Sequence, residues 1–111
     1  MLTYHLIPRE EYDPLAEEYA PAAFAREGFI HTTKTLGIIH EVANRYYRAD
    51  QRPYLLLTVD LDRVTAPWRY DAAGDDYPHV YGPLNRAAIV GSVPCPRAAD
   101  GVFLPLADTY A

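Results

Sequence analysis

The sequence predicts a small single α+β domain over residues 1–111, with a split, mainly antiparallel sheet and two or three helices. A chain of 111 residues, half of them hydrophobic, is long enough for one core and too short for two domains. Ten prolines, about twice the usual frequency, keep the elements short. Strand-like and helix-like segments alternate before a run of strand-like segments, which favours α+β over a doubly wound sheet.

The first part of the chain is predicted to form a strand followed by helix. Alternating apolar and polar residues predict a strand over Leu2–Ile7, which Pro8 ends. The Ala- and Glu-rich segment Asp13–Arg26 predicts a helix that is capped by its first residue and ends at Gly28. Because proline removes a helical hydrogen bond, Pro21 is expected to divide this segment into two short helices.

A second strand and the longest helix are predicted next. The composition of Gly28–Thr33 is strand-like, and Thr33 or Thr35 can cap a following helix. At this spacing His40 is predicted to be a packed core residue. The apolar face of the helix is predicted to contain Leu36, Ile39, His40, Ala43, Tyr46 and Tyr47.

The second half of the chain is predicted to consist mainly of strands. Tyr54–Leu61 is a nearly continuous apolar run, which is typical of a strand covered on both faces, so we expect it in the middle of the sheet. Turns are predicted at Ala73–Asp76 and Gly82–Pro83. Shorter strands are predicted at Trp68–Asp71, His79–Tyr81, Ala87–Val93 and Val102–Leu106.

Composition excludes several classes of function. The formal charge is −5 and the ten Lys and Arg residues are scattered, so we expect no nucleic-acid partner. No apolar run approaches the roughly 18 residues that span a bilayer, and the first residues lack the basic start of a signal peptide, so we expect no membrane partner and a cytoplasmic location. Cys95 is the only cysteine, which rules out an intrachain disulfide. A homodimer is the base-rate expectation for a soluble protein.

Three histidines are the first candidates for chemistry. His5 and His31 lie in predicted strands, and His79 starts another. An imidazole in a strand can donate a ring N–H to a substrate hydroxyl while a backbone carbonyl holds its other nitrogen. No two histidines have the spacing of a local metal site, so no metal is expected. A metal-dependent hydrolase, in which the three imidazoles converge from distant strands, is one alternative hypothesis.

Tyrosines and a polar stretch after residue 67 suggest a pocket. Ten tyrosines in 111 residues suit a pocket that stacks a planar heterocycle and hydrogen-bonds its edge. Arg69 can neutralise a phosphate or carboxylate, and Asp71 can stabilise an oxocarbenium-like sugar or act as a base. A second alternative hypothesis is a noncatalytic module that binds a small molecule in the same pocket.

Two segments resemble a bacterial family. Gly28-Phe29-Ile30-His31-Thr32-Thr33 and Tyr77-Pro78-His79-Val80-Tyr81-Gly82-Pro83-Leu84 are similar to motifs of the family called domain of unknown function 952, and the resemblance spans nearly the whole chain. That family is regarded as sharing the fold of ADP-ribosyltransferases. The resemblance therefore implies an ADP-ribosyltransferase-like fold and NAD as the bound cofactor or substrate.

The resemblance also implies roles for individual residues. His5 would hydrogen-bond the ribose next to nicotinamide, Asp71 would take the late acidic position, and His79 belongs to the family's second motif. The implied catalytic residues are His5, His31, Asp71 and His79. The implied cofactor-binding residues are Tyr4, Thr32, Thr33, Arg69 and Tyr81, with Arg86 as a second candidate for the pyrophosphate.

The function that these roles imply is the use of NAD or a related nucleotide metabolite. The reaction would be ADP-ribosyl transfer or cleavage of the glycosidic bond between nicotinamide and ribose. Departure of nicotinamide leaves a positively charged sugar, so a nearby carboxylate and an aromatic surface for the departing ring are the physical requirements. A small-molecule ligand is therefore the expected partner.

Overall fold

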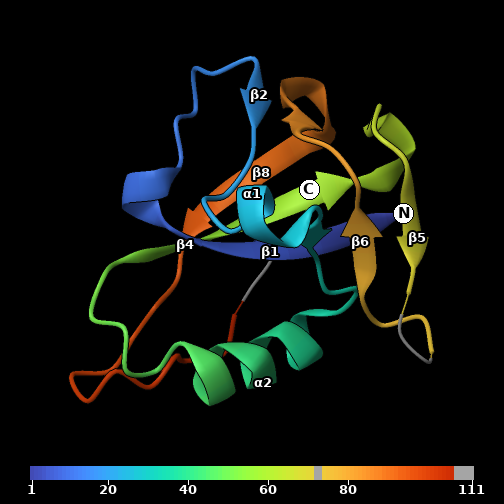
Figure 1. Ribbon diagram of the computed structural model, residues 1–111. Helices are drawn as coiled ribbons and strands as arrows, with labels where there is room; N and C mark the ends of the chain where they lie inside the picture. Colours follow the sequence, from blue (N-terminus) through green and yellow to red (C-terminus); the bar gives the residue numbers. More distant parts are fainter. Residues whose placement is uncertain (72–73, 107–111) are drawn as a thin grey trace.

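The computed structural model describes residues 1–71 and 74–106, which form three antiparallel sheets and two α-helices (Figure 1). The largest sheet has the strand order β1-β4-β8, with β1 at Leu2–Pro8, β4 at Tyr54–Asp60 and β8 at Ile89–Pro94. The prediction that the apolar run after residue 53 forms the central strand is confirmed, and β1 is an edge strand of this sheet.

Strand β4 is buried on both faces because its apolar run has no polar side. Leu55, Leu57 and Val59 point to one face and share a core cluster with Tyr19, whereas Leu56 points to the other face and packs with Ile39. Full burial of an aliphatic side chain contributes about 1.5–3 kcal/mol, so the packing of β4 on both faces stabilises the domain. Strand β1 follows β4 in register over its whole length.

Two smaller sheets extend the domain. One has the order β3-β6-β5, with β3 at Ile30–His31, β6 at Pro78–Val80 and β5 at Trp68–Tyr70. The other pairs β2 at Glu18–Tyr19 with β7 at Leu84–Asn85. The predicted strand over 28–33 is therefore shorter than expected, while those near 68–71 and 79–81 are confirmed to within one residue.

Strand β1 joins the β3-β6-β5 sheet at a single antiparallel bridge. Tyr4 donates its N–H to the carbonyl of Thr33 at 2.9 Å, and Thr33 donates to the carbonyl of Tyr4 at 2.8 Å. Behind this bridge, the buried hydroxyl of Thr3 donates to Thr32, which donates to the carbonyl of Pro78 at 2.6 Å. Thr32 thus links the two sheets from inside the core.

Helix α2 (Leu36–Tyr46) lies against the sheet face that carries Tyr4 and Leu56, below the sheet in Figure 1. Its N-cap is Thr35, whose hydroxyl accepts the N–H of Ile38 at 3.2 Å. Of the two predicted caps, Thr35 is confirmed, because the backbone of Thr33 is committed to the bridge with β1.

Replacing the cap by Thr35→Ala is expected to lower the free energy of unfolding by about 1 kcal/mol, since the amide of Ile38 loses its acceptor. Urea denaturation of the two proteins at pH 7 measures the difference. Thr35→Ser keeps a hydroxyl at the same place and is expected to retain most of the stability. Equal stability of the alanine and serine variants would contradict a capping role.

The predicted apolar face of α2 is correct at its centre and wrong at its end. Ile39 and Ala43 are buried, but Tyr46, the last residue of the helix, is 67% exposed. His40 is a packing residue, as predicted: its Nε2–H donates to the carbonyl of Phe103 at 2.8 Å. Asn44 also binds the backbone of Phe103 through both its amide groups.

The prediction of helix over 13–26 is wrong except for its last turn. Only α1 (Phe24–Glu27) is helical, and Gly28 ends it in the left-handed conformation at φ 80°, as predicted. The side chain of Asp13 caps a short turn by accepting the N–H of Leu15. The buried Tyr19 lies in β2, so its pairing with β7 and its place in the core override the helical composition.

Among the described residues, three 3₁₀ helices occur at the ends of strands: η1 (Arg9–Glu11), η2 (Leu61–Arg63) and η3 (Arg86–Ala88). The predicted strand over 87–93 accordingly begins at Ile89.

The predicted strand over 102–106 is wrong. This segment makes one isolated bridge, and the side chain of Asn44 hydrogen-bonds both backbone groups of Phe103. The turn predicted at 73–76 begins outside the described residues. No helix within the described residues is long and apolar enough to cross a membrane.

Candidate functional site

A cleft of about 480 Å³ lies along the outer edge of β1. Its floor is formed by the five consecutive residues 4–8 of that strand. One wall comes from α2, the opposite wall from α1 and the residues just before it, and the end from Arg52 and Tyr54. This volume falls within the range of about 300–1,000 Å³ that is usual for small-molecule sites.

The edge of β1 presents backbone hydrogen-bonding groups to this cleft. In an antiparallel strand, residues two apart direct their N–H and C=O groups to the same side. Tyr4 uses both groups for Thr33, on the side away from β4. The N–H and C=O of Leu6 therefore point outward too, into the cleft that Leu6 lines. One donor and one acceptor side by side match a primary amide.

His5 lies in the floor of the cleft with both ring nitrogens bonded inside the protein. Nδ1 is 2.7 Å from the carbonyl oxygen of His31, which can only accept, so Nδ1 carries the proton. Nε2 then accepts from the hydroxyl of Tyr19 at 2.8 Å. Burial lowers the pKa of His5 to about 4, so the ring is neutral at pH 7. A ligand hydroxyl reaches Nε2 only by displacing Tyr19.

His31 and His79 stand opposite each other on β3 and β6, with ring centroids 5.2 Å apart. Phe29 stacks on His79 at 4.3 Å and meets the edge of His31 at 4.7 Å. His31 lines the cleft and is largely exposed, and its Nε2 is 3.1 Å from a carboxylate oxygen of Glu27. His79 is mostly covered and supports His31 from behind.

Asp71 is one step further from the cleft. It accepts the Nδ1–H of His79 at 3.1 Å and the Nε–H of Arg69 at 2.7 Å. Desolvation raises the pKa of Asp71, but these two hydrogen bonds outweigh it and hold the pKa below its usual value. The guanidinium of Arg69 lies over the ring of Tyr81, 4.4 Å from its centroid.

The structure divides the predicted site residues into two groups. Lining the cleft are His5, His31, Tyr4 and Thr33. Outside the lining, His79 adjoins His31, and Asp71, Arg69 and Tyr81 follow behind His79 as a chain of contacts. Thr32 belongs to neither group, because its side chain is buried between the sheets. Arg86 binds the carbonyl of Pro14, and it is also absent from the cleft lining.

Several charged lining residues were missed by the sequence analysis. Arg26 and Glu27 come from α1, Glu11 from η1, and Arg52 from the segment before β4. Arg26 and Glu27 directly precede the motif Gly28–Thr33, and this proximity is the one weak signal in the sequence that they belong to a site. Nothing in the local pattern indicates Glu11 or Arg52, since they reach the cleft only through the pairing of β1 with β4.

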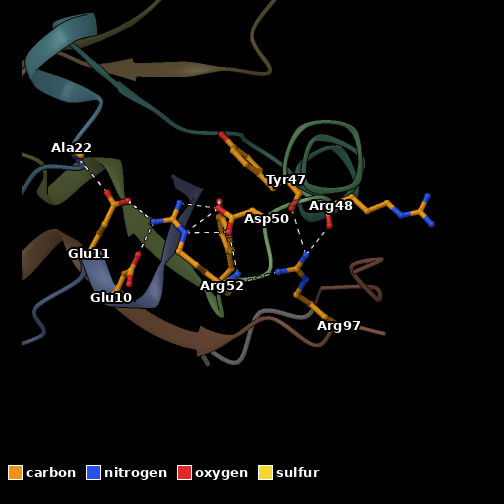
Figure 2. Close-up of polar contacts among 9 residues, drawn as sticks. Glu10, Glu11, Ala22, Tyr47, Arg48, Asp50, Arg52 and Arg97 are labelled. Carbon is orange, nitrogen blue, oxygen red and sulfur yellow. Dashed lines mark hydrogen bonds and ion pairs between the residues drawn. The ribbon is translucent and has the colours of Figure 1, made fainter. Parts of the chain in front are cut away.

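Arg52 is saturated by carboxylates at the end of the cleft (Figure 2). Its Nη1 is 2.7 Å from Glu10 and 3.5 Å from Glu11, and its Nε and Nη2 bind Asp50. These hydrogen bonds from Arg52 hold the pKa of Asp50 far below its usual value. Glu11 also accepts the N–H of Ala22 at 3.2 Å, so the cluster ties the end of β1 to the wall before α1.

No group of three or more His, Cys, Asp or Glu side chains in residues 1–71 and 74–106 is arranged to hold a metal ion. Cys95 is a single thiol whose pKa is raised to about 12 by burial.

Fold and site together define a small α+β domain whose edge strand forms the floor of a cleft lined by histidine, aromatic and paired charged residues. The chain belongs to the family described as protein of unknown function (DUF952), whose profile matches residues 7–92. The family resemblance seen in the sequence is thereby confirmed.

Three solved structures from Caulobacter crescentus resemble the domain. A crystal structure of protein CC0527 is 25% identical over 94% of each chain, with a TM-score of 0.75, and a crystal structure of its double mutant gives the same values. The solution NMR structure of CC0527 is 26% identical, has a TM-score of 0.69, and covers 91% of this chain and 90% of that one. No curated protein matches the chain.

Proposed function

We propose that the cleft binds a nucleotide metabolite that carries a nicotinamide ring, NAD being the first candidate, and that the domain cleaves the bond between this ring and ribose. One observation carries the proposal: a single cleft combines the three groups that this chemistry needs. The N–H and C=O of Leu6 suit the carboxamide, Phe29 and Tyr47 offer aromatic surface, and Glu27 supplies a carboxylate.

The reaction assigns a step to each of these groups. When the glycosidic bond breaks, its electron pair goes to the nicotinamide nitrogen and the sugar becomes positively charged. A carboxylate next to the sugar stabilises that charge electrostatically. Water then bonds to the anomeric carbon and releases one proton to the carboxylate; in the transfer reaction another nucleophilic acceptor takes the place of water.

Two carboxylates are candidates for this step. Glu27 lies on the cleft wall beside His31, whereas Asp71 is separated from the cleft by His79. We therefore assign Glu27 to the sugar and give Asp71 a positioning role, in which it orients His79 and through it His31. His5, being neutral and internally bonded, holds the carbonyl of His31 in place.

We also propose that the fold is ADP-ribosyltransferase-like. The supporting features are the histidine in the first strand, the two antiparallel three-stranded sheets that meet at one bridge, and the cleft beside that bridge. This relation is the reason to choose NAD as the first compound to test.

Incubation of the purified domain with NAD, followed by chromatography of released nicotinamide, tests the proposed activity. Release above the rate without protein, and its loss in Glu27→Gln, is the expected result, because the amide cannot stabilise a cationic sugar. Glu41→Gln on the exposed face of α2 is the matched control and should retain the wild-type rate. Undiminished release by Glu27→Gln would rule out the assigned role.

His31→Ala and His79→Ala are each expected to weaken binding of NAD about tenfold, equivalent to about 1.4 kcal/mol. His31→Ala removes a cleft-lining ring, and His79→Ala removes the ring behind it. Titration calorimetry measures the affinity, and thermal unfolding measures the stability. The melting temperature of His31→Ala should stay close to that of the wild type, since the ring is 58% exposed. Collapse of the fold in this variant would make the residue structural instead.

A second candidate, a noncatalytic small-molecule-binding module, is favoured by the state of His5. A neutral imidazole with both nitrogens bonded inside the protein is a poor general acid or base at pH 7. Saturable binding of NAD without any release of nicotinamide would support this function over cleavage.

A further inference from the structure

We infer that the cleft takes a pyridinium ribonucleotide with a single phosphate in preference to a dinucleotide, with Arg26 as the residue that pairs with the phosphate. This inference rests on the proposed function and names the substrate class for the same site. It follows from the charges of the lining residues rather than from the size of the cleft.

Arg52 is not available to a phosphate. Its guanidinium already binds Glu10 and Asp50 at 2.7–3.1 Å and lies 3.5 Å from Glu11, so one cation faces three carboxylates. A phosphate at this end would have to displace a carboxylate and would then lie beside the remaining ones. Like charges in such proximity cost more than the new pair would return.

Arg26 is in the opposite situation. It lines the cleft from α1, its side chain is exposed, and it makes no ion pair with any carboxylate in the described part of the chain. A guanidinium can bind one phosphate through two parallel hydrogen bonds. Within the described lining, Arg26 is the only Lys or Arg side chain left for a phosphate, because the only other one is Arg52.

The remaining charges favour a cationic ring. Two arginines stand against four carboxylates in and directly behind the lining, namely Glu10, Glu11, Glu27 and Asp50. The oxidised nicotinamide ring is a cation and is matched to this surplus of negative charge, while the reduced ring is neutral. A dinucleotide adds a second phosphate and an adenosine, for which the lining provides no second free cation.

The chemistry on this substrate is hydrolysis. The bond between the anomeric carbon and the pyridinium nitrogen breaks, and nicotinamide leaves with the electron pair. The oxygen of water bonds to the anomeric carbon, and one proton passes to Glu27 and then to solvent. The products are nicotinamide, ribose 5-phosphate and one proton, with no redox change.

Four compounds test the inference on the full chain: nicotinamide riboside, nicotinamide mononucleotide, its reduced form, and NAD. Calorimetry gives affinities, and chromatography gives nicotinamide release. The expected results are at least tenfold tighter binding of the mononucleotide than of NAD, and at least tenfold tighter binding of the oxidised than of the reduced mononucleotide. Faster release from the mononucleotide than from NAD supports hydrolysis of this class.

The variant Arg26→Ala tests the contribution of the phosphate to binding. It should lower the affinity for the mononucleotide about tenfold and leave the affinity for the riboside unchanged, because only the mononucleotide carries the phosphate. Arg45→Ala on α2, an exposed arginine outside the cleft, is the matched control and should change neither affinity.

Each other outcome has a distinct meaning. Tighter binding of NAD than of the mononucleotide overturns the inference and leaves the proposed function standing. An equal change in affinity for the mononucleotide and the riboside in Arg26→Ala has the same meaning. Binding of the mononucleotide without release supports the ligand class together with the noncatalytic function. Failure of all four compounds to bind or react overturns both the inference and the proposed function.

Discussion

Lowering the pH from 7 to 4 is expected to remove about 3 kcal/mol of folding free energy through His5 alone. Burial lowers the pKa of His5 in the folded protein to about 4, against 6.5 in the unfolded chain. Between these values the unfolded chain binds a proton that the folded protein does not. The contribution of His5 is therefore complete above about pH 6.5 and declines as the pH falls toward 4.

Urea denaturation at several pH values between 7 and 4, with His5→Gln as the comparison, isolates this contribution. Other groups also titrate in this range, so the informative quantity is the difference between the two pH profiles. The wild-type profile should be the steeper one, because glutamine does not titrate. Parallel profiles would show that His5 is not responsible, and an NMR titration of the imidazole gives its pKa directly.

The substitution Arg97→Ala is expected to cost about 3 kcal/mol, since several carbonyl groups lose a charged donor together. The guanidinium of Arg97 donates to the carbonyls of Arg52 at 2.9 Å, Arg48 at 3.1 Å and Gly101 at 3.0 Å (Figure 2 shows its contacts with Tyr47 and Arg48). Its carbon Cζ also lies 4.2 Å from the centroid of Phe103. One side chain thus ties the end of α2 to the C-terminal segment.

Thermal and urea unfolding of Arg97→Ala, Arg97→Lys and Arg45→Ala measure this effect. The lysine variant should fall between wild type and alanine, because an ammonium group cannot reach all of these carbonyls at once. Arg45→Ala should stay within about 0.5 kcal/mol of wild type, as an exposed residue away from such a network. If Arg97→Ala were as stable as Arg45→Ala, Arg97 would not stabilise the contact between the end of α2 and the C-terminal segment.

The elements with strong local signals were predicted well. The alternation after Leu2, the apolar run after Pro53 and the cap at Thr35 each fix a structure that the tertiary contacts reinforce. The segment 13–26 failed because its Ala and Glu content favours helix, while the burial of Tyr19 and the hydrogen bond of its hydroxyl to His5 require an extended chain there. A distant contact overrode the local propensity.

The candidate site was predicted in part. Their places in predicted strands and the family resemblance indicated His5, His31 and His79. His5 and His31 line the cleft, and His79 lies next to His31. The carboxylate on the wall, Glu27, was missed because it belongs to a single helical turn whose place is set by the packing of Phe24 against the core cluster. Arg52 was missed for a similar reason, since its position at the cleft follows from strand pairing.

By itself the sequence determined the α+β class, the central strand, the long helix and the family, because periodicity, proline placement and motif order are local properties of the chain. Only the tertiary structure decided that β1 is an edge strand, that residues 4–8 along its outer edge form the floor of a cleft, and which charged side chains surround it. These features depend on which segments pair although they lie far apart in the sequence. The contacts that stabilise this pairing are long-range, so no local sequence pattern predicts them.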